Sequence, residues 1–257
     1  MKWPSMVTLI RHDKSAYNAL RDLKELDPDY REFKQFFDQH GPHHPRVRYL
    51  AEKVKARVRL DVGDWNTPLH DGAGCDAKTV GARLAESHPL PDVIYVSPYL
   101  RTVDTLKWLK EGWPALNDVP TFEDDRIREQ EHGLAVLYND WRLFHVFHPE
   151  QHDLFALDGS YRYRYPQGEN MYDVRQRGRD FFTMLGREYA GQVVLVISHH
   201  LTILGIRANR ERWSAKQFIK EDSDNKPINC GVTIYRGMPD QGKDGRLVLQ
   251  DYNLKLY

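Results

Sequence analysis

Two apolar runs rich in β-branched residues lie far apart in the chain, and each ends almost at once in histidine. Residues 7–10 lead into Arg11 and His12, and residues 193–197 lead through a serine into His199 and His200. Runs of this kind are typical of buried strands. In an open α/β sheet, ligands bind outside the carboxyl ends of the strands. We therefore expect these distant histidines to meet in one site.

Further strand-like runs alternate with helical patterns. They lie at residues 93–97, 231–235 and 247–250. A helix is expected after the first of these, with Ser97 as its N-cap and Pro98 at its first position. Another is expected over residues 171–189, where the apolar side chains share one stripe. The alternation predicts an α/β fold, a three-layer α/β/α sandwich.

Two stretches are interpreted as insertions into a single domain that spans residues 1–257. Residues from about 19 to 66 contain two further helical patterns, and residues from about 134 to 165 are dense in aromatic side chains and histidine. Together they are expected to form a lid over the strand ends. Alternating tyrosine and arginine at residues 161–164 either select part of the substrate or pack within the lid.

The balance of charge argues against a polyanionic partner. The chain has 37 basic and 37 acidic residues, which predicts neither nucleic acid nor a membrane surface as a partner. No apolar run reaches the roughly 18 residues of a membrane span, and no signal-peptide core follows Met1. Two cysteines are too few for a disulfide framework. We expect a cytoplasmic protein whose partner is a small molecule. The oligomeric state stays open, and a homodimer is one of the alternatives.

The segment after the first run has the features of an anion site. Ser15 is a natural N-cap, Asn18 follows at the third helical position, and the free N–H groups of such a helix start bind anions. Arg11 adds a planar fork of donors that suits phosphate oxygens. The alternative is an ordinary salt bridge beside a hydrogen-bonded histidine.

Three other segments contain candidates for chemistry. Arg101 lies in the first turn of a predicted helix, where the helix dipole disfavours a cation by about 0.3–1 kcal/mol, so either a bound anion or a surface acid is expected near it. His199 follows the most hydrophobic strand and is expected to be partly desolvated. Neighbours leaving a strand diverge, so only one of His199 and His200 should face the ligand. Glu129 and Glu131 are candidate proton donors or part of a solvated loop.

The twelve histidines do not indicate a metal site. His40, His43 and His44 lack the i, i+4 spacing of helical ligand pairs. We therefore expect no metal and no other cofactor.

Six blocks resemble, in order, the motifs of the histidine phosphatase superfamily, the phosphoglycerate mutase-like fold. Leu9-Ile10-Arg11-His12-Asp13-Lys14-Ser15-Ala16-Tyr17-Asn18 resembles L-x-R-H-G-x-S-x-x-N. The later blocks are Pro68-Leu69 with Ala77, Ser97-Pro98-Tyr99-Leu100-Arg101-Thr102, Ile127-Arg128-Glu129-Gln130-Glu131-His132-Gly133, Pro166-Gln167-Gly168-Glu169-Asn170, and Val196-Ile197-Ser198-His199-His200.

The resemblance implies a role for each matching residue. His12 would be the nucleophile that takes the phosphoryl group, and Glu129 the general acid for the leaving alkoxide. The phosphoryl oxygens would be surrounded by Arg11, Arg101 and His199. Ser15 and Asn18 match positions that contact phosphate in the family.

Two departures from the family pattern affect the expected pocket. Asp13 and His200 replace glycines, and we include both among the candidate substrate-binding residues. A carboxylate at position 13 would repel substrate, orient His12 or supply a second proton. A side chain at position 200 would narrow the pocket.

The resemblance leaves three functions to compare. Metal-independent hydrolysis of a small phosphomonoester through a phosphohistidine is favoured, because the roughly thirty residues after the acid block are fewer than the glycolytic mutases carry. The alternatives are mutase-type phosphotransfer and a non-catalytic phosphate-binding or scaffold protein of the same fold.

Overall fold

The centre of the molecule is a six-stranded sheet in a computed structural model that describes residues 2–257. The strand order is β3-β2-β4-β1-β5-β6, and the first four strands in this order run parallel. β5 and β6 are antiparallel additions at one edge. The strands are β1 (Met6–Arg11), β2 (Val93–Val96), β3 (Thr121–Glu123), β4 (Val193–Ser198), β5 (Val232–Met238) and β6 (Arg246–Leu254).

The register of β1 and β4 explains why two distant histidines meet. These strands are parallel neighbours, and Arg11 pairs with Ser198 at their carboxyl ends. Both strands are almost wholly buried, which is why their sequences are continuous apolar runs rather than alternating ones. The next residues, His12 and His199, consequently leave the sheet side by side.

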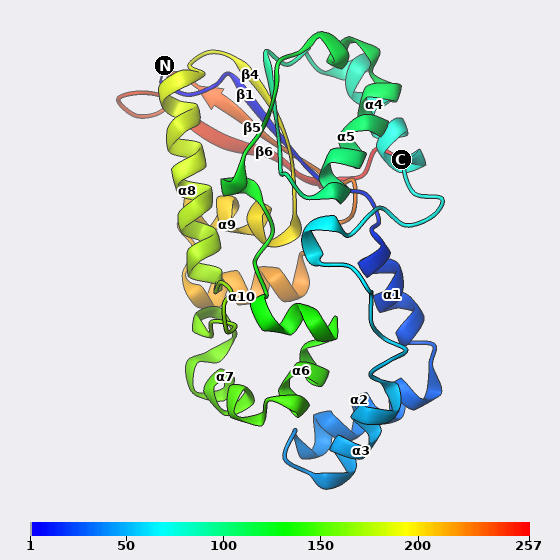
Figure 1. The fold of residues 1–257 in the computed structure, drawn as a ribbon. Helices are drawn as coiled ribbons and strands as arrows, with labels where there is room; N and C mark the ends of the chain where they lie inside the picture. Colours follow the sequence, from blue (N-terminus) through cyan, green and yellow to red (C-terminus); the bar gives the residue numbers. More distant parts are fainter. Residues whose placement is uncertain (1) are drawn as a thin grey trace.

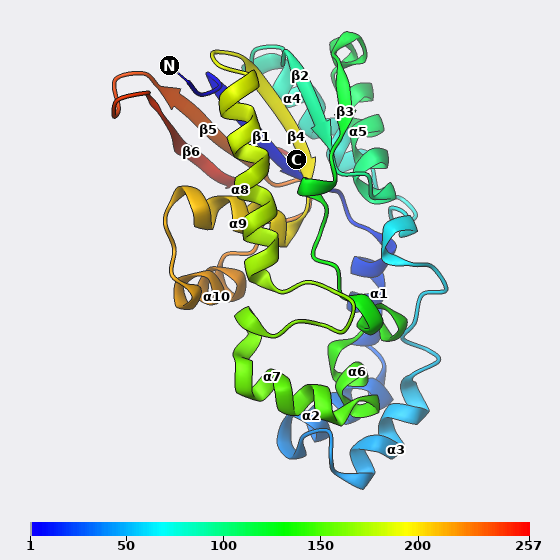
Figure 2. The ribbon, with the colours of Figure 1, turned by 60° about the vertical axis from the view of Figure 1, so that its left-hand side comes forward.

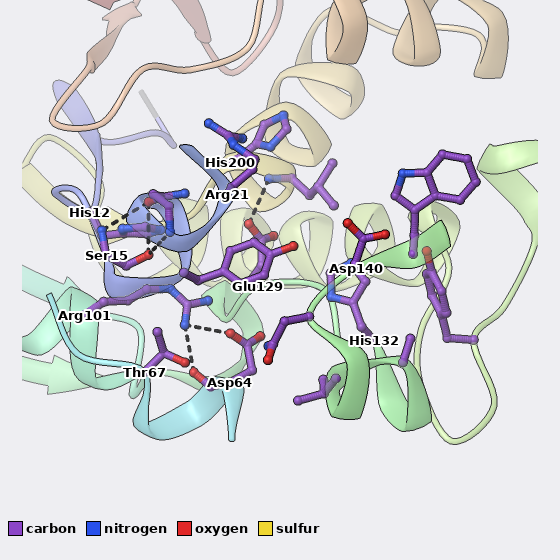
Figure 3. A pocket seen from close by; sticks show the side chains of 18 of the residues that line it. His12, Ser15, Arg21, Asp64, Thr67, Arg101, Glu129, His132, Asp140 and His200 are labelled. Atoms are coloured by element: carbon purple, nitrogen blue, oxygen red, sulfur yellow. Dashed lines mark hydrogen bonds and ion pairs between the residues drawn. The ribbon is translucent and has the colours of Figure 1, made fainter. Parts of the chain in front are cut away.

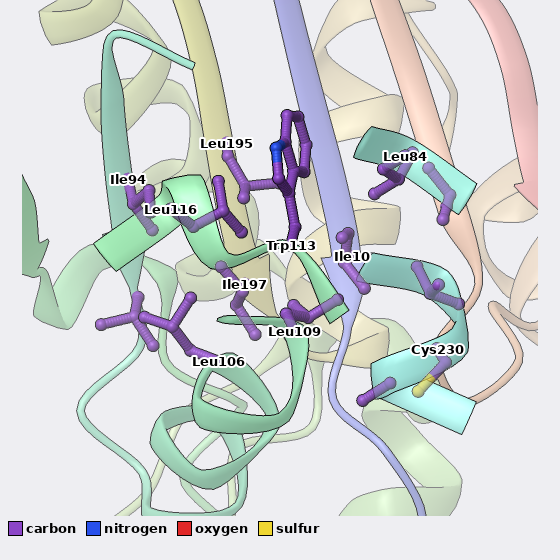
Figure 4. Packing of buried hydrophobic residues seen from close by; sticks show 14 of the residues in the cluster. Ile10, Leu84, Ile94, Leu106, Leu109, Trp113, Leu116, Leu195, Ile197 and Cys230 are labelled. Atoms are coloured by element: carbon purple, nitrogen blue, oxygen red, sulfur yellow. The ribbon is translucent and has the colours of Figure 1, made fainter. Parts of the chain in front are cut away.

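Helices cover both faces of the sheet (Figure 1). α4 (Cys75–Ser87) and α5 (Leu100–Gly112) pack against one face, where Leu84 and Leu109 meet Ile10 and other strand residues (Figure 4). α8 (Met171–Glu188) and α9 (His200–Arg210) cover the other, through Phe181 and Ile203. The predicted three-layer sandwich is confirmed.

The sequence predicted the start of α8 correctly and the start of α5 wrongly. α8 begins at Met171, because Asn170 and Asp173 form a reciprocal capping box. α5 begins at Leu100 instead of Pro98. The Ser97 hydroxyl lies 2.7 Å from Nε2 of His199, so it contacts the site and does not cap the helix where the sequence suggested.

A separate group of helices lies beyond the carboxyl ends of the strands (Figures 1 and 2). We call it the cap; its members are α2 (Pro28–His40), α3 (Pro45–Val54), α6 (Trp141–Phe147) and α7 (Pro149–Arg162). One apolar cluster joins its two halves, with Phe33 of α2 and Leu50 of α3 packed together with Leu143 of α6. The predicted insertions thus form one lid, although the expected start at residue 19 falls inside α1 (Ala16–Lys24).

A buried polar contact fixes the cap to α1. The ammonium of Lys24 pairs with the carboxylate of Asp140, which also accepts a hydrogen bond of 2.5 Å from the Tyr30 hydroxyl. The remaining elements are α10 (Ala215–Asp224) and the short 3-10 helices η1 (Asp64–Asn66), η2 (Pro114–Asp118), η3 (Asp125–Ile127) and η4 (Gly133–Tyr138). Within residues 2–257, no helix combines the length and the apolar character that a membrane crossing needs.

Candidate active site

A cavity of about 270 Å³ lies between the end of β1 and the cap (Figure 3). Its inner end is lined by Arg11, His12 and Arg101, and Glu129 forms part of its wall. The outer part belongs to the cap and to the segments that lead into it. The cavity thus lies at the carboxyl edge of the parallel strands, where the sequence places the candidate site.

His12 is buried with a defined tautomer. Its Nδ1 lies 2.6 Å from the carbonyl oxygen of Asp13, and a carbonyl can only accept, so Nδ1 carries the proton. In the neutral ring, Nε2 is then left with a free lone pair. Burial lowers the pKa of His12 well below its usual value, and the charges of Arg101 and Arg11 lower it further. The ring is therefore neutral, and hence nucleophilic, at pH 7.

His199 stands beside His12, with the two ring centroids 5.2 Å apart. It is fully buried, and Nε2 contacts the Ser97 hydroxyl while Nδ1 has no hydrogen-bond partner within the described part of the chain, residues 2–257. Burial lowers its pKa well below the usual value, and Arg101 adds to the effect. An uncharged donor or acceptor therefore adjoins the nucleophile candidate.

Two guanidinium groups line the inner end of the cavity. Arg11 donates through Nη1 to the Pro227 carbonyl at 2.6 Å, while its buried Nε has no hydrogen-bond partner among residues 2–257. Burial and the nearby Arg21 and Arg101 lower the pKa of Arg11 to about 10, which keeps it protonated at pH 7. Arg101 is 5% exposed and forms an ion pair of 2.8 Å with Asp64.

Ser15 and Asn18 both line the cavity and hold the start of α1 together. The Ser15 hydroxyl accepts from the Asn18 N–H at 3.3 Å, and Asn18 Oδ1 accepts from the Ser15 N–H at 3.1 Å. This capping box is the one that the sequence indicated. The helix start therefore points into the site.

Of the two candidate acids, Glu129 faces the cavity and Glu131 does not. The carboxylate of Glu129 accepts from the Gln130 N–H at 3.0 Å and from the Leu201 N–H, at the start of α9, at 3.4 Å. Glu131 instead pairs with Arg128 at 3.1 Å.

Asp13 occupies a different place from the one expected for a substrate-binding residue. Its carboxylate does not line the cavity, and accepts from the N–H groups of Gly74 at 2.9 Å and Ala77 at 3.3 Å. The carboxylate is turned aside because the start of α4 offers it free donors. His12 is oriented by the Asp13 carbonyl group and not by its side chain.

His200 lines the cavity, and its Nε2 lies 2.7 Å from a carboxylate oxygen of Asp222 on α10. His199, its neighbour, points the other way, toward Ser97. The two side chains diverge as expected for consecutive residues, and of the two only His200 lines the cavity, while His199 packs beside the ring of His12.

Several cavity residues were not found from the sequence. Tyr17, Trp141 and Tyr165 supply aromatic surface, and Asp64 holds Arg101 in place. None of residues 161–164 lines the cavity, and Tyr161 and Tyr163 are buried, which agrees with the alternative that this segment packs within the lid. The next residue, Tyr165, does line the cavity. Tyr17 lies inside the phosphate motif, a signal that could have been used.

Over residues 2–257, no three acidic, histidine or cysteine side chains are placed to hold a metal ion together.

Parallel strands whose ends bring a buried histidine and two guanidiniums to one cavity define an α/β protein with a site suited to an anion. The particular family follows from a comparison of sequences: the model of the histidine phosphatase superfamily (branch 1) matches residues 52–243. The chain belongs to this family. The matched region contains Arg101, Glu129 and His199 and begins after the His12 segment.

Individual relatives agree with the family. The phosphoglycerate mutase-like protein AT74 of Arabidopsis thaliana is 27% identical over 236 residues, covering 83% of this chain and 69% of the relative. A 2,3-bisphosphoglycerate-dependent phosphoglycerate mutase of Tropheryma whipplei is 29% identical over 144 residues, covering 48% and 63%. The α-ribazole phosphatase structure from Shigella flexneri shares the fold, with a TM-score of 0.66, 16% identity and coverage of 97% and 96%.

Proposed function

We propose that the protein hydrolyses a small phosphomonoester, without a metal, through a phosphohistidine on His12. The observation that carries the proposal is the state of this ring. It is buried and neutral, with its proton held on Nδ1 by a backbone carbonyl. Arg11 and Arg101 lie where the charge of a phosphoryl group would need them.

The reaction has two balanced steps. In the first, Nε2 of His12 attacks phosphorus, the bond from phosphorus to the ester oxygen breaks, and Glu129 donates its proton to the leaving alkoxide. In the second, water attacks the phosphohistidine, the P–N bond breaks, and the Glu129 carboxylate takes the proton. General acid–base catalysis of this kind contributes typically about 10²–10⁴ in rate. The two arginines and the start of α1 stabilise the charge on the equatorial oxygens.

A small substrate is favoured by the size of the cavity. A volume of about 270 Å³ is slightly below the range of roughly 300–1,000 Å³ common for ligand sites. A phosphate group at its inner end leaves space for a compact alcohol against Tyr17 and Tyr165.

The cytoplasmic location and the single-domain organisation stay predictions.

The test is phosphate release in the presence of a chelator from an aryl phosphate, sugar phosphates, phosphoglycerates and nucleotides. The native protein is compared with His12→Ala and with the control His43→Ala, an exposed cap histidine paired with Asp153. We expect turnover and an acid-labile phosphoenzyme that His12→Ala alone abolishes. Phosphoryl exchange between phosphoglycerates without release would indicate a mutase. Absence of any phosphohistidine would indicate a binding protein.

A further inference from the structure

Behind Glu129, away from the cavity, lies a buried ion pair that the proposed reaction does not use. Glu169 precedes α8, and Arg177 lies on this helix; their side chains are 9% and 13% exposed. The contact is two-pronged, with Nε to Oε1 at 2.7 Å and Nη2 to Oε2 at 2.8 Å. Neither residue lines the cavity.

The other donors of Arg177 bind the backbone that carries Glu129. Nη1 donates to the carbonyls of Arg126 at 2.8 Å and Arg128 at 3.1 Å, and Nη2 donates to the carbonyl of Glu129 at 3.3 Å. With the two bonds to Glu169, these contacts use all five N–H groups of a guanidinium. The side chain thus fixes three residues of one short segment, which begins in η3, at once.

Glu169 holds the same segment from its other side. Its carboxylate accepts from Arg128 Nη2 at 2.9 Å and from the Glu131 N–H at 3.1 Å. Its backbone N–H donates to the Glu131 carbonyl at 2.8 Å, and its carbonyl accepts from Gln130 Nε2 at 2.7 Å. We call residues 126–131 the acid segment.

The carboxylate of Glu129 is held much less firmly than its backbone. Its two hydrogen bonds run to the next residue in the chain and, at 3.4 Å, to Leu201. Its position relative to the cavity therefore depends mainly on where the acid segment is held. Proton transfer requires the acid within about 2.6–3.2 Å of the leaving oxygen, so a small shift of the segment impairs it.

We propose that Glu169 and Arg177 are positioning residues that keep Glu129 in reach of the leaving group. The proposal rests on the proposed function of Glu129. A buried ion pair is weak evidence for a gain in stability, because desolvation offsets most of its attraction. The hydrogen bonds of the pair hold the whole acid segment in one position, and a fixed position of the acid is what proton donation needs.

The test compares two substrates that differ in their need for an acid. The dinitrophenolate of dinitrophenyl phosphate leaves without a proton, whereas the alkoxide of glycerol phosphate requires one. The comparison is made in kcat/KM, which reports the steps up to release of the leaving group, because hydrolysis of the phosphohistidine is common to both substrates and also uses Glu129. Glu169→Gln and Arg177→Lys should lower kcat/KM on glycerol phosphate by about 10–100-fold, a part of the general-acid contribution. On dinitrophenyl phosphate the loss in kcat/KM should stay within about threefold, because its leaving group needs no proton and Arg11, His12 and Arg101 are untouched. The matched controls are Glu188→Gln and Arg179→Lys, both exposed on α8.

Three outcomes overturn or separate the two assignments. Equal losses on both substrates would mean a purely structural role, and no loss on either would mean no role; each overturns the positioning proposal. Glu129→Gln must show the same dependence on the leaving group. If it does not, the assignment of Glu129 as the general acid is refuted, while the proposed phosphohistidine on His12 is unaffected. If Glu169→Gln does not fold, Arg177→Lys, which keeps the charge and loses the fork, decides between the same outcomes.

Discussion

Asp13, where the family motif has glycine, should matter for stability and not for catalysis. Its carboxylate accepts from two buried N–H groups at the start of α4, those of Gly74 and Ala77. Asp13→Gly leaves both unpaired, at about 1–3 kcal/mol for each donor that water does not reach. A lost N-cap costs typically about 0.5–2 kcal/mol. We expect a loss of about 2–3 kcal/mol, or roughly 4–12 °C in Tm for a chain near this size.

The assay is urea or thermal unfolding alongside turnover at a temperature where the variant stays folded. kcat should stay within about threefold of native, because the bond to His12 Nδ1 comes from the backbone carbonyl at position 13. The matched control is Asp76→Asn, an exposed acid in the first turn of the same helix. An unchanged Tm with a large fall in kcat would refute the capping argument and assign the carboxylate to the chemistry.

Three further predictions concern pH and the cap. Burial lowers the pKa of His12 and His199, so below about pH 6.5 the unfolded chain binds more protons than the folded protein. The free energy of unfolding should therefore fall as the pH drops through that value. A free energy that urea titrations find unchanged with pH would contradict this. For the same reason phosphoenzyme formation, followed by rapid quench, should persist at pH 6 without an inflection near 6.5. Lys24→Met should lower the free energy of unfolding, measured by calorimetry, by about 3–5 kcal/mol, because it leaves the buried Asp140 carboxylate without its cation. A change below about 1 kcal/mol would mean that water reaches this carboxylate.

The inner part of the candidate site could be predicted because it is encoded locally. His12 and His199 each follow a run of apolar residues that must be a buried strand, and parallel strands bring their carboxyl ends to one edge. Ser15 and Asn18 form a capping box within four consecutive positions, a signal that needs no tertiary information.

The residues that escaped prediction depend on contacts between distant segments. Asp64 reaches Arg101 from a three-residue 3-10 helix that produces no periodic pattern. β3 is three exposed residues long, too short for alternation to show. The orientation of Asp13 was undecidable, because the donors that attract its carboxylate lie some sixty residues away on α4.

The apolar cluster that joins the two halves of the cap also affects folding during translation. Tyr30, Phe33 and Leu50 leave the ribosome well before Leu143, the residue of α6 that covers them. At about 5–20 residues per second, the first half of the cap waits roughly 5–20 s with its apolar face uncovered. That interval is long enough for a nascent chain to aggregate or to be bound by a chaperone. Slower translation between the two halves should therefore lower the soluble yield without changing the finished molecule.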